Sequence, residues 1–331
     1  MPRRPGVTAV LALLLACASS LPAHAARLTV LHTNDTHGHL VPFRDTGGRG
    51  RDGTAAADRA ERDLGGIARR ATLVDSIRAE CLARGEAVLA IDAGDFCDGT
   101  SFSTEYRGEA DLAAMRAAGY DFVTLGNHDF NNTAAQVRRF GGGPGPRVLL
   151  ANVLERDGRP LAPPWTMLTL DSLRVGLFGL VEESTAHYPA AVEAFRVLPV
   201  ESTARAVADT LRARGADLVV LVSHCGLGTD RELAGSVPEL DVIVGGHSHS
   251  RLPVGEYFRP FQASPADSHG TIVGQAHQWG AELGRLDLDL ARDGTGRWRV
   301  ARHEAALLPV TGALAPDGAV AALVDSFWRP I

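Results

Sequence analysis

The chain of 331 residues is long enough to bury one substantial core, and its length alone permits one domain or two. Its formal charge of −6 argues against a protein that binds nucleic-acid polymers, because such binding depends on cationic surface. The sequence contains no lysine, which excludes both a Schiff-base lysine and a phosphate-binding P-loop lysine.

The first 25 residues resemble a secretory signal. They combine a basic start, an apolar run too short to cross a bilayer, and the small-x-small tripeptide Ala-His-Ala at 23–25. We therefore predict that residues 1–25 are a signal peptide and that the protein is periplasmic or secreted. A minor alternative is a lipoprotein cleavage box at 14–17, which would leave the protein anchored through Cys17. No other segment is apolar enough to predict a transmembrane span.

Short apolar segments rich in β-formers alternate with helical patterns along the chain. The predicted strands lie at 28–32, 87–92, 122–125, 174–180, 218–222, 241–244, 271–274 and 284–290. The predicted helices lie at 66–84, 109–118 and 202–214. This alternation predicts an α/β domain around a largely buried sheet. The glycine-rich stretches at 45–63 and 141–146 predict flexible loops.

Three cysteines follow the predicted signal, so at most one intramolecular disulfide can form among them. Cys81 falls on the apolar face of the first predicted helix, where we expect a buried thiol. Cys97 and Cys225 each lie beside a candidate metal ligand, and the sequence leaves open whether they pair.

Polar clusters follow five of the predicted strands directly. They read NDTHGH at 34–39, DAGDFCDG at 92–99, GNHDF at 126–130, SHCG at 223–226 and GGHSH at 245–249. In an α/β sheet these loops lie at the carboxyl ends of the strands, where ligands bind. Side chains of His, Asp and Asn suit a pair of divalent ions such as Zn, Mn, Fe or Co. Two such ions roughly 3.5–4 Å apart can hold a phosphoryl group and lower the pKa of a bound water.

In order along the chain, these clusters resemble the five motifs of the calcineurin-like metallophosphoesterases. The segments LTVLHTNDTHGHL at 28–40 and QAHQWGAELGRLDLDL at 275–290 are similar to the secreted bacterial 5′-nucleotidases and 2′,3′-cyclic-nucleotide phosphodiesterases. The resemblance implies that residues 26–331 form one four-layer α/β/β/α sandwich. It also implies a metal-dependent phosphoric ester hydrolase of nucleotide catabolism, acting on a small phosphorylated, nucleotide-like substrate.

The resemblance further implies a ligand set for two divalent ions, whose identity stays open. One ion would be held by Asp35, His37 and His249, the other by Asn127, His224 and His247, with Asp95 bridging both. A hydroxide that bridges the two ions would then attack the phosphorus.

His128 is expected by the same analogy to face the substrate. It would stabilise charge on the phosphoryl oxygens or protonate the leaving group. For this it needs a carboxylate that keeps it protonated and oriented. The nucleotidases usually read G-N-H-E-F-D and use the final Asp, but this chain has Asn131 there. We predict that Asp98 takes this role, with Asp129 as the second candidate and a simple turn cap as the alternative interpretation of Asp98.

The C-terminal segment 314–331 resembles the start of a helix that links the nucleotidases to a second, nucleoside-binding domain. No residues remain here for that domain, so we expect loops such as 45–63 to choose the substrate. Trp279 could offer a stacking face to an aromatic leaving group, and core packing is the alternative. Other functions left open are hydrolysis of a non-phosphate ester and a lobe that needs a second polypeptide. The oligomeric state is also open.

Overall fold

The structure is a computed structural model that describes residues 26–45, 62–142, 145–261, 270–293 and 296–329. The predicted signal peptide, with Cys17, and most of the predicted insert at 45–63 lie outside these residues. Among the described residues, no helix has both the length and the apolar composition that a bilayer crossing requires.

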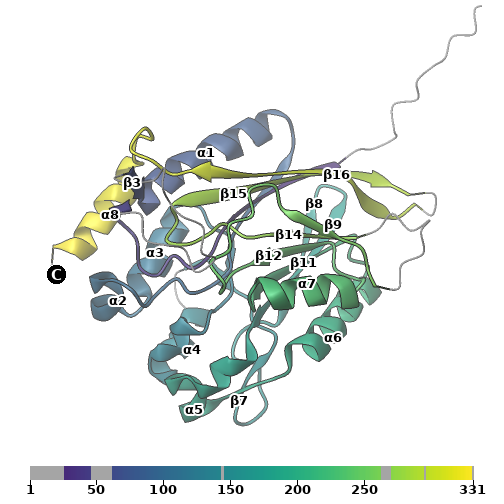
Figure 1. Cartoon of the computed structure of the whole chain (residues 1–331), viewed down its shortest axis with the longest axis horizontal. Helices are drawn as coiled ribbons and strands as arrows, with labels where there is room; N and C mark the ends of the chain where they lie inside the picture. The colour runs from purple at the N-terminus through teal and green to yellow at the C-terminus, as the bar shows by residue number, and fades with distance from the viewer. Residues whose placement is uncertain (1–25, 46–61, 143–144, 262–269, 294–295, 330–331) are drawn as a thin grey trace, which may run out of the picture.

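Two six-stranded sheets form the centre of the molecule (Figure 1). The first has the order β16-β15-β1-β4-β5-β6. Strands β1, β4, β5 and β6 are parallel, and β15 and β16 extend the sheet in antiparallel fashion. The strands are β1 (Ala26–Thr33), β4 (Ala87–Asp92), β5 (Phe122–Val123), β6 (Arg147–Val148), β15 (Glu282–Arg292) and β16 (Trp298–Pro309).

The second sheet has the order β13-β14-β12-β11-β9-β8. Its inner strands β14, β12, β11 and β9 are parallel, and the outer strands β13 and β8 run antiparallel to their neighbours. The strands are β8 (Trp165–Leu170), β9 (Leu173–Val181), β11 (Leu218–His224), β12 (Val242–Gly245), β13 (Glu256–Phe258) and β14 (Thr271–Gly274).

The central strands are buried on both faces, which explains why they read as apolar runs in the sequence. Every residue of β11 is buried, for example. Along β1 the side chains alternate, so that Val30 packs between the two sheets while Leu31 faces the helices. A third apolar cluster lies on the outer face of the second sheet, beneath α6 and α7. The clusters therefore separate four layers, α/β/β/α.

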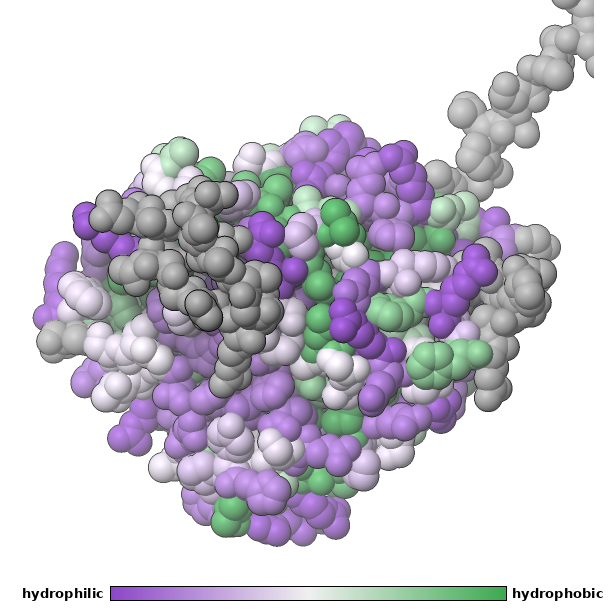
Figure 2. Space-filling model, in the orientation of Figure 1, coloured by the Kyte–Doolittle hydropathy of each residue, from purple (hydrophilic) through white to green (hydrophobic). Residues whose placement is uncertain are grey.

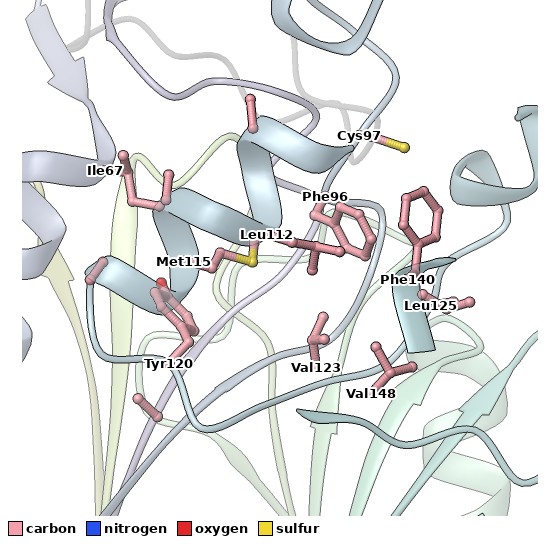
Figure 3. Packing of buried hydrophobic residues seen from close by; sticks show 14 of the residues in the cluster. Ile67, Phe96, Cys97, Leu112, Met115, Tyr120, Val123, Leu125, Phe140 and Val148 are labelled. Carbon is pink, nitrogen blue, oxygen red and sulfur yellow. The ribbon is translucent and has the colours of Figure 1, made fainter. Parts of the chain in front are cut away.

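Helices cover the outer face of each sheet (Figure 1). The first sheet packs on its helices through the apolar cluster shown in Figure 3. In this cluster, Leu112 and Met115 of α3 lie beside Val123 of β5. The helices are α1 (Ile67–Ala83), α2 (Ser101–Tyr106), α3 (Glu109–Ala117), α4 (Ala134–Gly142), α5 (Pro189–Ala194), α6 (Val200–Ala213), α7 (Leu227–Ser236) and α8 (Gly318–Trp328). The predicted helices correspond to α1, α3 and α6, and each predicted strand is present. The predicted fold, a four-layer sandwich, is confirmed.

Several short elements complete the chain. Strand β2 (Pro42–Asp45) pairs with β3 (Arg62–Gly65), and β7 (Val153–Glu155) pairs with β10 (Phe195–Val197). Two 3₁₀ turns, η1 (His128–Asn131) and η2 (Glu183–His187), follow β5 and β9. The sequence did not indicate β16, because most of its residues are partly or fully exposed and form no continuous apolar run.

Other local features refine the sequence predictions. The stretch 141–146 is not entirely a loop, since Gly141 and Gly142 end helix α4. Cys97 and Cys225 do not pair, and Cys81 is buried in the core as predicted. Helix α8 packs on α1 and α3 of the same domain, and its role as a linker to another domain stays a prediction. The surface seen in Figure 2 intersperses hydrophobic residues among hydrophilic ones.

Candidate active site

The polar clusters meet because the strands that precede them end at the same level of the two sheets. Thr33 is paired with Asp92 at the ends of β1 and β4, and Ser223 with Gly245 at the ends of β11 and β12. The loops are then joined by backbone hydrogen bonds, such as the one from the Asp35 N–H to the Gly94 carbonyl (2.9 Å). The His247 N–H, in a loop of the second sheet, donates to the Asp35 carboxylate of the first (2.9 Å), so the loops of both sheets form one floor for the site.

The backbone of this floor is strained at the residues whose side chains point inward. The φ angle lies between 46° and 71° at Asp35, His37, Asp95, His247 and His249. Each such conformation costs a non-glycine residue about 1–2 kcal/mol and persists only where the surroundings enforce it. Strain concentrated in this way indicates that the loops are bent to bring polar side chains together.

A glycine permits the closest approach between two of these loops. A Cβ atom at Gly126 would lie 2.1 Å from Asp95 Oδ1. In its place the Asp95 carboxylate accepts a hydrogen bond from the His128 N–H (2.8 Å). The Gly126 position therefore admits no side chain, which explains the glycine that opens the GNHD motif.

Asp35, His37 and His249 form the first group of potential ligands. His249 Nε2 lies 3.1 Å from Asp35 Oδ1 and 3.3 Å from His37 Nε2. The His37 Nδ1–H donates to the Asp98 carbonyl oxygen (2.9 Å), so the lone pair of a neutral imidazole is at Nε2 and faces the group. Burial lowers the pKa of His37, which favours this neutral form.

The second group is centred on His224. Its Nε2 lies 3.1 Å from Asp95 Oδ2 and 3.2 Å from Asn127 Oδ1, and its Nδ1–H donates to the Ala93 carbonyl oxygen (2.6 Å). Asn127 Oδ1 is also 2.8 Å from His247 Nδ1. Asp35 Oδ1 is 3.9 Å from His224 Nε2, which makes Asp35 a member of both groups.

The charges in the second group show what the cluster accommodates. Burial alone would lower the pKa of His224, but Asp95 and Asp35 outweigh it and raise this pKa to about 10. Burial would likewise raise the pKa of Asp95, but His224 and His37 hold it well below its ordinary value. The cluster therefore favours a positive charge at His224 Nε2, which either a proton on the ring or a metal ion beside the neutral ring can supply.

A divalent cation can supply this positive charge, and the side chains of the cluster are suitable metal ligands. Both His37 and His224 use their second ring nitrogen to donate to a backbone carbonyl, as metal-binding histidines usually do. Imidazole, carboxylate and amide ligands suit zinc, manganese and iron. The structure brings all of the predicted ligands together: Asp35, His37, Asp95, Asn127, His224, His247 and His249.

His128 lies at the exposed side of this cluster. Its Nδ1 is 2.8 Å from Asp98 Oδ2, and the side chains of the two residues are 41% and 46% exposed, respectively. Asn131 Nδ2 donates to the same Asp98 oxygen (2.6 Å), so the amide supports the carboxylate instead of replacing it. Asp98 also links the two parts of the site, because its carbonyl holds His37.

Asp129, the second candidate for this partnership, points elsewhere. It is fully buried and accepts hydrogen bonds from the backbone N–H groups of Asp95 (3.1 Å), Gly126 (2.8 Å) and Cys97 (3.2 Å). The Cys97 thiol donates to it as well (3.1 Å). Asp129 thus ties the GNHD loop to the Asp95 loop, and of the two acids only Asp98 contacts the His128 ring.

Sequence reasoning missed several residues that hold the ligands in place. Buried Asn34 donates to Asp35 Oδ2 (2.6 Å) and accepts from the Ala276 N–H (2.8 Å). Buried Gln275 donates to the Gly246 carbonyl (2.8 Å) and accepts from the Ser248 hydroxyl (3.0 Å). Asn34 belongs to a polar cluster that the sequence had singled out, and Gln275 directly follows β14 at the same edge. A polar residue directly after a predicted strand was therefore the sequence signal that could have identified both.

Tyr188 was also missed, and it had no such signal. It follows the 3₁₀ turn η2, outside the five polar clusters that the sequence singled out. Its hydroxyl accepts a hydrogen bond from Asn127 Nδ2 (2.6 Å), and its ring meets the His128 ring edge-on, with centroids 6.0 Å apart.

An aromatic group and a polar cavity border the site. Trp279 stacks on His39 at 4.9 Å and meets Phe43 edge-on at 5.6 Å, so packing covers part of its half-buried ring. Beside Asp98, a cavity of about 320 Å³ is lined by side chains that include Asn131 and Arg107.

Comparisons with known proteins agree with this geometry. The sequence model of the calcineurin-like phosphoesterases matches residues 28–251. A 5′-nucleotidase of Vibrio parahaemolyticus is 30% identical over 85% of the chain and 52% of its own length. A solved 5′-nucleotidase precursor from Thermus thermophilus is 30% identical with a TM-score of 0.76, covering 92% of this chain and 59% of that one.

A more distant structure shares the fold alone. The sulfate thiohydrolase SoxB of Thermus thermophilus is 22% identical with a TM-score of 0.76, covering 94% of this chain and 61% of that one. The chain spans about half the length of the curated relatives that it matches.

Proposed function

The chain belongs to the calcineurin-like phosphoesterases, a family of metal-dependent phosphoester hydrolases with a two-metal centre, and on that premise we propose that it is a secreted hydrolase of nucleotide-like phosphate esters. Export rests on the signal-like pattern of residues 1–25. The nucleotide-like substrate class rests on the relatives that are named 5′-nucleotidases.

One observation carries the proposal. Ligand atoms of carboxylates and imidazoles lie within 4.8 Å of one another in two groups, the Asn127 amide oxygen lies 3.2 Å from His224 Nε2, and the His128 N–H donates to the Asp95 carboxylate beside them. A cluster that served stability alone would pair each acceptor with a donor. Here the Nε2 atoms of His37 and His249 lie 3.3 Å apart beside Asp35, and Asn127 Oδ1 faces two imidazole nitrogens, contacts that a metal ion between these atoms would satisfy.

The ligands divide between two ions. Asp35, His37 and His249 would hold one, Asn127, His224 and His247 the other, and Asp95 lies close to both His37 and His224. When bound, the ions would supply positive charge for the phosphoryl oxygens and lower the pKa of water at the site.

His128 is the side chain that would stabilise charge on the phosphoryl group or protonate the leaving group. With Nδ1 directed at Asp98, its Nε2 is the nitrogen left for the substrate. From there it can donate to a phosphoryl oxygen as charge develops or deliver a proton to the leaving-group oxygen, a contribution typically of about 10²–10⁴-fold. Asp98 and Asn131 set the orientation of the ring.

Phosphate release by metal-stripped protein tests the proposal. The protein is reconstituted with Mn, Zn, Co or Fe and assayed against AMP, a cyclic nucleotide and a simple aryl phosphate. We expect release only after a metal is restored. A strong preference for AMP would support the nucleotide-like class, whereas equal turnover of all three esters would replace it with a broad phosphohydrolase.

A metal-site variant and a second class of ester provide two further tests of the proposed function. His224→Ala removes a ligand from the second group, so added metal should no longer restore phosphate release. His303→Ala, which is remote from the site, should behave as the wild type. Two bound ions per chain without release from any phosphate ester would overturn the proposal. Release of sulfate from a thiosulfate ester under those conditions would support the non-phosphate alternative.

A further inference from the structure

Tyr188 reaches the site from a part of the chain that carries none of the predicted ligands. Strand β9 ends at Val181, which is paired with His224 at the end of β11. The chain then turns through η2, and the Tyr188 N–H donates to the Thr185 carbonyl (3.0 Å) just before Pro189 begins α5. Tyr188 is therefore fixed at the same sheet edge as the ligands.

Its hydroxyl contacts one ligand side chain directly. Asn127 Nδ2 donates to the Tyr188 hydroxyl oxygen at 2.6 Å, while Asn127 Oδ1 faces His247 Nδ1 at 2.8 Å and His224 Nε2 at 3.2 Å. The two ends of a primary amide are nearly equal in size, so hydrogen-bond partners decide which end faces the cluster. Only the oxygen can bind a cation, because the amide nitrogen has no available lone pair.

The nitrogen end of the amide is held apart from the oxygen end. Asn127 is buried, and among the described residues Tyr188 is the partner found for its amide nitrogen. The Tyr188 hydroxyl therefore holds the nitrogen end of the amide in place while the oxygen faces the imidazoles.

We propose that Tyr188 is a positioning residue for the metal centre, which holds the Asn127 amide with its oxygen directed at the second ion. This inference rests on the proposed function, since it assumes that Asn127, His224 and His247 hold a metal. Removal of a residue that orients a metal ligand typically costs about 10–100-fold in affinity for the metal.

Metal affinity of Tyr188→Phe, measured without substrate, tests the proposal. Zinc or manganese is titrated into metal-free protein in competition with a chromophoric chelator. We expect one of two binding steps to weaken about 10–100-fold and the other, at Asp35, His37 and His249, to remain unchanged. At saturating metal, kcat should return towards the wild-type value.

Matched variants separate orientation from general damage. Tyr106→Phe removes a hydroxyl that donates to the Phe327 carbonyl (2.8 Å) far along the chain, and should leave both steps unchanged. In an Asn127→Ala background, Tyr188→Phe should weaken metal binding no further, because the two residues act through one amide.

The outcomes decide between clear alternatives. Unchanged metal affinity in Tyr188→Phe would overturn the inference, whether kcat is retained or lost at saturating metal. A loss of kcat alone would mean that the tyrosine acts on the substrate itself. If the wild type bound no metal, the proposed function would fail first, whereas two bound ions with an unaffected variant would refute only the role of Tyr188.

Discussion

Substitution of Asp98 by Asn tests the pairing with His128 by removing a charge while keeping an acceptor. The amide oxygen of Asn can still accept from His128 Nδ1, and the carbonyl that holds His37 is unchanged. Because the two side chains are 41% and 46% exposed, solvent screens the lost charge to about 1 kcal/mol. That energy corresponds to roughly a fivefold loss of kcat.

Asp98→Ala removes the hydrogen bond as well as the charge. A hydrogen bond to a charged group contributes about 1.5–3 kcal/mol, so this variant should lose more than tenfold in kcat. We therefore expect kcat to be highest in the wild type, lower in Asp98→Asn and lowest in Asp98→Ala. If the Asp98 carboxylate were buried, the loss of kcat from wild type to Asp98→Asn would be much larger.

The assay is kcat for phosphate release at saturating metal, with the metal content of each variant measured in parallel. Asp157→Asn is the matched control, since it neutralises an exposed carboxylate that pairs with Arg159 at 2.7 Å in another part of the chain. Unchanged kcat in both Asp98 variants would refute the pairing. A loss above a thousandfold in Asp98→Asn, with metal content intact, would refute the argument from solvent exposure.

Three further predictions concern the site and its support. His128→Gln should lower kcat by about 10²–10⁴-fold while metal stoichiometry, measured by elemental analysis, stays the same. Metal at 100 times its Kd should stabilise the fold by about 2.7 kcal/mol, seen as a rise in Tm that a chelator reverses and that His224→Ala lacks. Burial raises the pKa of Asp111 from 3.8 to about 8, so the folded state retains a proton that the unfolded state releases, and stability falls as the pH rises from about 4 to 8. Asp111→Asn should remove up to about 6 kcal/mol of this loss, and a free energy of unfolding that falls between pH 5 and 8 as steeply in the variant as in the wild type would contradict the prediction.

Much of the site was predictable because each ligand cluster directly follows an apolar run. Strands such as β1 and β11 are buried on both faces, so their apolar sequences are continuous, and the polar residues that end them stand out. Where burial is partial, as in β16, the pattern disappears and the strand was missed. The sequence also indicated Asp98, since the Asn at 131 left His128 without an acid at its usual position.

The sequence by itself determined which chemistry is available, namely strands that end in carboxylates, imidazoles and an amide. Only the tertiary structure decided how these groups are used. Asp98 and Asp129 are both aspartates of the polar clusters, yet one contacts the His128 ring and the other is buried beneath three backbone N–H groups. Tyr188 reaches Asn127 across 61 positions because the sheet that contains β9 packs against the sheet that contains β5. Contacts of this kind depend on which strands are neighbours, and local sequence carries no record of that.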